Sequence, residues 1–149
     1  GNSAPLADGA SMILLGSGKV GQKLGLKPKA RILAASVLGV EPSLMLHGSS
    51  LAAHKAMSIA GLKTEDIEIW ESNELFAAVG LKFLEEMNLD SDKVNVYGSD
   101  IAWGYAAGAM GAIAVNTLLD ALEDKDKSVG AVGLCTRGGM STSLIIERV

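Results

Sequence analysis

Apolar and polar residues alternate along this chain in blocks that predict alternating strands and helices. The pattern predicts strands over residues 10–15, 30–40, 67–70, 129–135 and 141–149. It predicts helices over residues 17–24, 49–60, 73–87 and 106–122. Helices interleaved with strands favour an α/β fold, in which a mixed sheet is covered by helices on both faces.

Small polar residues and glycines mark the ends of these elements. Ser49 or Ser50 is expected to cap the helix over 49–60, and Ser72 or Asn73 the helix over 73–87. Gly138 and Gly139 lie between the last two strands, so we expect a closing hairpin there.

Composition narrows the class of protein. The 149 residues, 48% hydrophobic and 20% charged, suit one soluble domain over 1–149 with a largely aliphatic core, because only 4% are aromatic. No apolar run is long enough to span a membrane, and the net charge of −4 disfavours nucleic acid as a partner. The single cysteine excludes an internal disulfide, which fits a cytoplasmic location.

Three stretches carry candidate chemistry. Cys135 ends a predicted strand just before Gly138 and Gly139, whose backbone N–H groups could face an oxyanion, and its thiol could move a proton if its pKa is lowered. Asn73 is either a helix cap or a site residue that holds a water or a carbonyl. The glycine-rich stretch 95–112 lets the backbone approach a ligand or another segment closely. His47 and His54 lack partners at ligand spacing, so no metal is expected.

Together these motifs resemble the C-terminal half of the thiolase family, over essentially the whole chain. Residues 1–10 look like the segment that enters that half, and residues 73–77 are similar to its asparagine–glutamate–x–phenylalanine motif. The stretch 95–112 resembles the loop that contains a glycine–histidine–proline motif. Cys135 with Gly138–Gly139 matches the cysteine-plus-glycines motif.

The resemblance implies a fold and an activity. The fold is a thiolase-like half with a five-stranded mixed sheet and helices on both faces. The activity is acyl transfer between coenzyme A thioesters, with carbon–carbon bond formation or thiolytic cleavage. In this family a cysteine of the N-terminal half takes the acyl group, a histidine of the C-terminal half activates it, and a second cysteine moves the substrate's proton. Cys135 and Asn73 match two of the family's site positions.

The chain also departs from the family pattern. Tyr105 follows Gly104 where the family has its histidine, Tyr97 stands where it has asparagine, and Arg137 where it has glycine. Tyrosine titrates near 10, so it is a poor base at neutral pH, but it can donate a hydrogen bond to an oxyanion. We therefore expect Cys135, Asn73 and Tyr105 to meet in one pocket, with Gly104, Gly138 and Gly139 shaping its backbone.

The leading interpretation is a thiolase C-terminal domain that is inactive alone and needs an N-terminal half or subunit with the nucleophilic cysteine. An acyl-CoA thioester is the expected substrate, and no further cofactor is expected. We also expect exposed apolar surface that supports homo-oligomers or partner binding. Two alternatives stay open: a thiolase-like lyase that uses Tyr105, and a non-catalytic module that binds acyl-CoA or scaffolds a complex.

Overall fold

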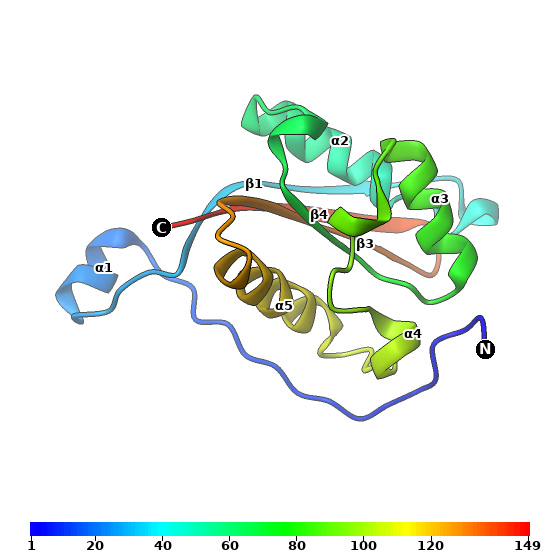
Figure 1. Ribbon diagram of the computed structural model, residues 1–149, viewed down its shortest axis with the longest axis horizontal. Helices are drawn as coiled ribbons and strands as arrows, with labels where there is room; N and C mark the ends of the chain where they lie inside the picture. The colour runs from blue at the N-terminus through cyan, green and yellow to red at the C-terminus, as the bar shows by residue number, and fades with distance from the viewer.

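Four strands form one mixed sheet in the computed structural model, which describes all of residues 1–149 (Figure 1). The strands are β1 (Ala30–Gly39), β2 (Ile69–Ser72), β3 (Val129–Thr136) and β4 (Met140–Arg148). Their order across the sheet is β1-β4-β3-β2. Only β2 and β3 run parallel, so their carboxyl ends lie side by side at one edge of the sheet.

Helices cover both faces of this sheet. Two of them, α2 (Ser49–Ala60) and α3 (Ala77–Met87), lie on one face, and α5 (Met110–Asp124) lies on the other (Figure 1). Two shorter helices are α1 (Gly18–Lys23) and α4 (Asp100–Trp103). Single 3-10 turns follow β1, α2 and α3, at Pro42–Leu44, Thr64–Asp66 and Ser91–Lys93. The predicted α/β layering is therefore confirmed.

The two-residue period of the strands divides the core into two halves. Trp70 is fully buried against Phe83 of α3, with ring centroids 5.8 Å apart in an edge-on arrangement. Its neighbour Ile69 faces the other way and packs in the cluster that contains Leu118 of α5. Side chains of adjacent strand residues point to opposite faces of the sheet, and helices cover both faces. Successive positions of a strand are therefore buried, which explains why the strands are nearly continuous apolar runs in the sequence.

The expected fifth strand is absent. Residues 10–15 run as extended chain beside α5, where Asn116 Nδ2 donates to Ser11 Oγ at 2.8 Å. Met12, Leu14 and Leu15 are 88%, 80% and 71% exposed. The segment is apolar enough for a strand, but within this chain it finds neither a strand neighbour nor a helix that would bury its side chains. The sheet consequently has four strands and the expectation of five was wrong.

Two expected helix caps were also wrong. The helix α3 begins only at Ala77, with Phe76 at its cap position, because the Asn73 amide is bonded to another strand instead. At the start of α2, Gly48 occupies the cap position without a side-chain bond, and the Ser50 hydroxyl donates to Glu86 of α3. In both places a polar side chain makes a tertiary contact that no local pattern encodes.

The closing hairpin is confirmed. Residues 137–139 join β3 to β4, and Gly138 and Gly139 have φ angles of +80° and +77°, which strain any residue with a Cβ. Gly139 also lies against the chain that follows β1, because Val40 N–H donates to Gly139 O at 2.7 Å. A Cβ on Gly139 would lie 2.4 Å from Val40 O, whereas nothing lies within 4 Å of a Cβ on Gly138.

These two glycines therefore make a matched pair of substitutions. We expect Gly138→Ala to lower the free energy of unfolding by about 1 kcal/mol, the cost of backbone strain alone. Gly139→Ala should cost about 3 kcal/mol or more, since the new methyl group also displaces the Val40 backbone. Urea unfolding followed by circular dichroism measures both values. Equal losses in the two variants would show that the hairpin does not depend on this close approach.

Candidate functional site

The carboxyl ends of the parallel pair β2 and β3 bring Asn73 and Cys135 together. Ser72 is paired with Gly133, so Asn73 leaves β2 beside the last residues of β3. Both side chains are only 2% exposed. In α/β sheets the carboxyl ends of parallel strands are where ligands bind, because side chains from neighbouring strands meet there.

The Asn73 amide extends the sheet ladder beyond the end of β2. Its Nδ2 donates to Cys135 O at 3.0 Å, and Cys135 N–H donates to its Oδ1 at 2.9 Å. The opposite amide orientation would set donor against donor and acceptor against acceptor, so the bonds themselves fix the orientation. Two hydrogen bonds inside the protein hold one side chain, which leaves Asn73 almost no freedom to rotate.

The Cys135 thiol faces two oxygen acceptors. Its Sγ lies 3.2 Å from Leu46 O and 3.4 Å from Asn73 Oδ1. Leu46 has a φ of 74°, a conformation that few residues with a Cβ adopt and that turns this part of the chain toward the sulfur. A thiolate would be repelled by both oxygens, while a thiol can donate its proton to either. The site therefore favours the neutral thiol.

Burial has the same consequence for the thiol. Burial is the main reason why the pKa of Cys135 rises to about 11, and the charge of Asp100 raises it further, against a lowering by hydrogen bonds from Asn73 and the backbone. At neutral pH Cys135 is thus protonated. The sequence analysis made proton transfer by this thiol depend on a lowered pKa, and the structure instead raises the pKa.

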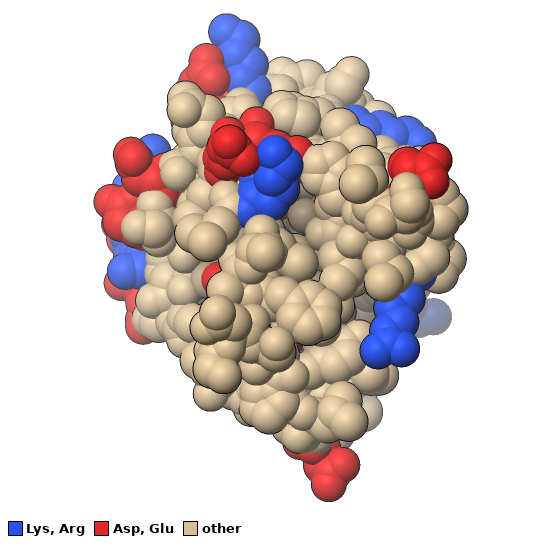
Figure 2. Space-filling model, turned by 90° about the vertical axis from the view of Figure 1, so that its right-hand side faces the viewer, with Lys and Arg blue, Asp and Glu red and all other residues tan.

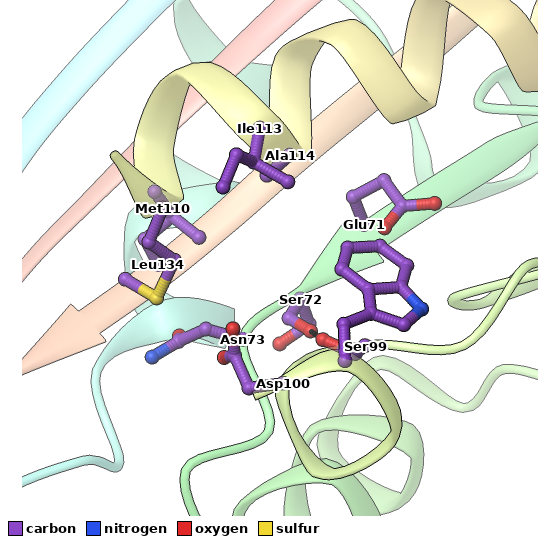
Figure 3. Close-up of a pocket in the computed structure, with 10 residues that line it drawn as sticks. Glu71, Ser72, Asn73, Ser99, Asp100, Met110, Ile113, Ala114 and Leu134 are labelled. Atoms are coloured by element: carbon purple, nitrogen blue, oxygen red, sulfur yellow. Dashed lines mark hydrogen bonds between the residues drawn. The ribbon is translucent and has the colours of Figure 1, made fainter. Parts of the chain in front are cut away.

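Asn73 also lines a small pocket (Figure 3). Its polar residues come from the end of β2 and the start of α4, and its apolar residues come from the end of α4, from α5 and from β3. The polar wall consists of Glu71, Ser72, Asn73, Ser99 and Asp100. The pocket has room for roughly one water molecule.

Two carboxyl groups in this pocket titrate far from their ordinary values. Glu71 is 2% exposed, its Oε1 has no hydrogen-bond partner, and burial together with Glu74 and Asp100 raises its pKa to about 8. Burial raises the pKa of Asp100 to about 6, against the opposing effect of the Glu74 N–H, which donates to Asp100 Oδ2 at 3.1 Å. At pH 7 Glu71 is therefore mainly protonated and Asp100 mainly ionised.

Side-chain bonds tie the glycine-rich stretch to the end of β2. Asn95 Nδ2 donates to Glu74 Oε1 at 2.8 Å, and Asn95 Oδ1 accepts from Ser72 N–H at 2.8 Å. Ser99 Oγ donates to Ser72 O at 2.9 Å. Through these bonds the loop that precedes α4 is fixed against the residues beside Asn73, and it places Asp100 in the pocket.

The other predicted site residues lie around this centre without contacting it. Tyr105 pairs through its backbone with the N-terminal segment, since its N–H donates to Pro5 O at 2.7 Å. No hydrogen bond joins its phenol to Asn73 or Cys135, and it does not line the pocket. Gly104 serves the same backbone contact, because a Cβ there would lie 2.6 Å from Ala7 Cβ. Its expected part in an oxyanion environment stays a prediction.

Gly138 and Gly139 have structural roles in the hairpin, and their backbone N–H groups donate no hydrogen bond within the protein. Of the two, Gly138 is exposed and Gly139 is buried, and the expected part of both in an oxyanion environment stays a prediction. His47, which has no partner at ligand spacing in the sequence, lies with Nδ1 3.2 Å from Oε1 of Glu86 on α3. No group of three or more histidine, cysteine, aspartate or glutamate residues is arranged to hold a metal ion.

Sequence analysis missed three groups of this site: the Leu46 carbonyl and the Asp100 and Glu71 carboxyls. Glu71 offered a signal, because a charged residue at the carboxyl end of a predicted strand stands where α/β folds bind ligands. Asp100 and Leu46 offered none, since each reaches the site through a loop whose path depends on tertiary contacts.

Comparison with known proteins decides the family. A family model described as "Thiolase, C-terminal domain" matches residues 26–148. This chain belongs to the thiolase family. It is 41% identical over 152 residues to a 3-ketoacyl-CoA thiolase of Saccharophagus degradans, covering 100% of this chain and 39% of that protein. It is 40% identical over 149 residues to an acetyl-CoA acetyltransferase of Escherichia coli, covering 100% of this chain and 38% of that protein.

Solved thiolase structures match this thiolase domain closely. The crystal structure of the Bacillus anthracis acetyl-CoA acetyltransferase has a TM-score of 0.86 and 36% identity. That of the human mitochondrial 3-ketoacyl-CoA thiolase has a TM-score of 0.87 and 32% identity. Both alignments cover 89% of this chain and 34% of the other. The chain thus spans less than two fifths of the thiolases it matches. None of its helices has the length and apolarity needed to cross a membrane.

The buried Glu71 carboxyl should make the stability of this thiolase domain depend on pH. Its pKa is about 8 in the folded chain against an ordinary 4.5, so between these values the folded state keeps a proton that the unfolded state has lost. Stability therefore falls as pH rises from 4.5 to 8, by about 3 kcal/mol at pH 7. Glu71→Gln should remove most of this fall.

Urea unfolding at pH 5, 6, 7 and 8 measures the effect as the difference between the slopes of the two proteins. Glu65→Gln is the matched control, since Glu65 is exposed on a turn and its variant should follow the original protein. Parallel stability curves for the original chain and the Glu71→Gln variant would contradict the raised pKa.

Proposed function

We propose that this chain is the C-terminal domain of a thiolase-type acyltransferase that acts on coenzyme A thioesters. Cys135 moves the substrate's proton, and Asn73 positions a water or a thioester carbonyl. Tyr105 supplies a hydrogen bond in place of the family's histidine. The acyl group itself is carried by a cysteine of an N-terminal half that this chain does not contain.

The contact between Asn73 and Cys135 is the observation that carries the proposal. Residues from two of the family's motifs, 62 positions apart in the chain, lie in direct contact at the carboxyl ends of β2 and β3. The thiol is neutral, buried and faced by acceptors, which is the state of a group that donates a proton rather than attacks a carbonyl.

The surroundings of this centre support a thioester with an apolar acyl group. Three apolar side chains lie within a few positions of Leu46, Asn73 and Gly139 along the chain. Each is about half exposed: Met45, Phe76 and Met140. The end of the molecule that contains the N-terminus and α4 is mostly uncharged at its surface, with Lys, Arg, Asp and Glu gathered mainly toward its margin (Figure 2). Such a surface suits an acyl chain or a second protein better than a highly charged ligand.

A missing half is the proposed partner of this surface. The chain spans 38–39% of its curated relatives, so more than half of each relative lies outside the match. The outer side of α2, which faces solvent in this chain, carries two apolar side chains. Leu51 is 46% exposed and Ile59 is 60% exposed. We propose that an N-terminal thiolase half covers α2 and that homo-oligomers form from the completed subunit.

The proposal is tested by combining the chain with the N-terminal half of the Escherichia coli acetyl-CoA acetyltransferase and measuring thiolytic cleavage of a 3-ketoacyl-CoA. We expect activity only in the mixture. Cys135→Ala should then lower kcat by about a hundredfold or more, since a general acid contributes 10²–10⁴ in rate. Tyr105→Phe should lower it by about a hundredfold, the effect of removing one oxyanion donor.

Tyr97→Phe is the matched control, because the Tyr97 hydroxyl donates to Asp124 at the surface, outside the proposed site. Full activity after Cys135→Ala would refute the proposed proton transfer. If the mixture assembles but stays inactive even with Tyr105→His, while acyl-CoA still binds, the chain is a non-catalytic acyl-CoA-binding module. Activity that depends on Tyr105 but not on a nucleophile in the other half would favour the lyase.

A further inference from the structure

Residues 10–15 form an extended segment whose backbone is almost unpaired. None of the N–H groups of residues 9–16 donates a hydrogen bond within the chain. The only carbonyl of this stretch that accepts one is Met12 O, from Asn116 Nδ2 at 3.4 Å. A row of unpaired N–H and C=O groups on extended backbone is the property of a strand at the edge of a sheet. The segment therefore has the backbone of a strand but no neighbouring strand.

Its side chains also follow the two-residue period of a strand. Ser11 and Ile13 are half-buried, and Ser11 is bonded to Asn116 of α5. Met12 and Leu14 alternate with them and are 88% and 80% exposed. In a strand such alternating positions lie on opposite faces of the sheet. One face of the segment thus rests near α5, while the other presents large apolar side chains that nothing in this chain covers.

The helix that follows is uncovered as well. The helix α1 contains no buried residue, and Figure 1 shows it set apart from the sheet and from α5. Val20 and Leu24, one helical turn apart, are 51% and 64% exposed. A helix of six residues is marginal in water by itself, so α1 requires a surface on which these side chains can pack.

The family comparison separates this segment from the C-terminal domain. The model of that domain begins its match at residue 26. The relatives from Saccharophagus degradans and Escherichia coli nevertheless match 100% of this chain. Residues before 26 therefore resemble thiolase sequence that the C-terminal domain model does not include. The match covers 39% and 38% of these two proteins, so most of each remains to supply a neighbour for the segment.

A second copy of this chain offers poor edges for such a strand. The outer edge of β2 is occupied, because Asn95 N–H donates to Trp70 O at 2.9 Å and Asn95 Oδ1 accepts from Ser72 N–H. On the outer edge of β1, Lys55 Nζ donates to Val37 O at 2.9 Å. Lysine on a sheet edge disfavours the addition of another strand. The neighbour is therefore better sought in a different sheet.

We propose that residues 10–15 add a strand to the edge of a sheet in an N-terminal thiolase half, and that Val20 and Leu24 pack on the same half. The unpaired backbone supplies the hydrogen bonds, and Met12 and Leu14 supply the apolar contact on one face. The identity of this partner rests on the proposed function. The apolar pattern of residues 10–15 then encodes a strand of the assembled protein, which this chain cannot form alone.

Hydrogen exchange of the backbone amides, followed residue by residue by NMR, tests the pairing. In the isolated chain the amides of residues 10–15 should exchange as fast as unstructured backbone, since none is hydrogen-bonded. The partner for the test is the N-terminal half of the Escherichia coli acetyl-CoA acetyltransferase. In the mixture alternate amides should exchange about a hundredfold more slowly, because an edge strand pairs through every second residue.

A double variant tests the apolar contact. Met12→Asp combined with Leu14→Asp should weaken binding of the half by about a hundredfold or more in isothermal titration calorimetry, because two apolar side chains lose their burial. Both residues are exposed in the isolated chain, so its fold should persist, which circular dichroism checks. Val37→Asp is the matched control, since Val37 is 70% exposed on β1, outside the segment, and its variant should bind as the original chain does.

Binding that leaves residues 10–15 unprotected, or that tolerates the double variant, would overturn the inference. Protection that arises in the chain alone and grows with its concentration would also overturn it, by assigning the strand to a second copy. Absence of any complex counts against both this contact and the proposed partner. If the halves pair through residues 10–15 but the mixture has no acyltransferase activity, the proposed function fails while the contact stands.

Discussion

The pair of hydrogen bonds between the Asn73 amide and the Cys135 backbone is the interaction on which the rest of the site depends. It joins two parallel strands beyond the point where β2 ends, and it buries the amide and the thiol together. With both ends of the amide bonded inside the protein, any rotation would leave buried polar groups without partners, at about 1–3 kcal/mol for each. This rigidity fixes one oxygen beside the sulfur.

The remaining contacts of the site serve the same centre from different parts of the chain. The turn at Leu46 brings a carbonyl to the sulfur, and the hairpin that follows Cys135 is held by the approach of Gly139 to Val40. Asn95 and Ser99 attach the glycine-rich loop to the end of β2. Loops that are fixed by buried hydrogen bonds can present reactive groups with the precision of regular structure, which supports the proton transfer proposed here.

Burial dominates the electrostatics of the Cys135 side chain and favours the neutral thiol. Burial raises the pKa of the thiol most, hydrogen bonds from Asn73 and the backbone lower it, and the net value is about 11, while the oxygens of Leu46 and Asn73 lie within reach of the sulfur as acceptors. A nucleophilic cysteine needs the reverse arrangement. This environment and the family relationship support the proposal that the nucleophile lies in one thiolase half and a proton donor in the other.

From sequence alone, apolar periodicity gave the layered fold and the extent of α2, and the paired glycines gave the hairpin. The family motifs indicated that Asn73 and Cys135 belong to one site. All of these are local signals, which a sequence contains. Sequence alone placed a strand at residues 10–15 because apolarity is local too, whereas forming a strand requires an available neighbour. The tertiary structure alone decided that Asn73 bonds β3 rather than capping α3, and that Asp100 and Glu71 are buried beside it. Their protonation depends on burial and on charges brought together from distant segments, which no stretch of sequence contains by itself.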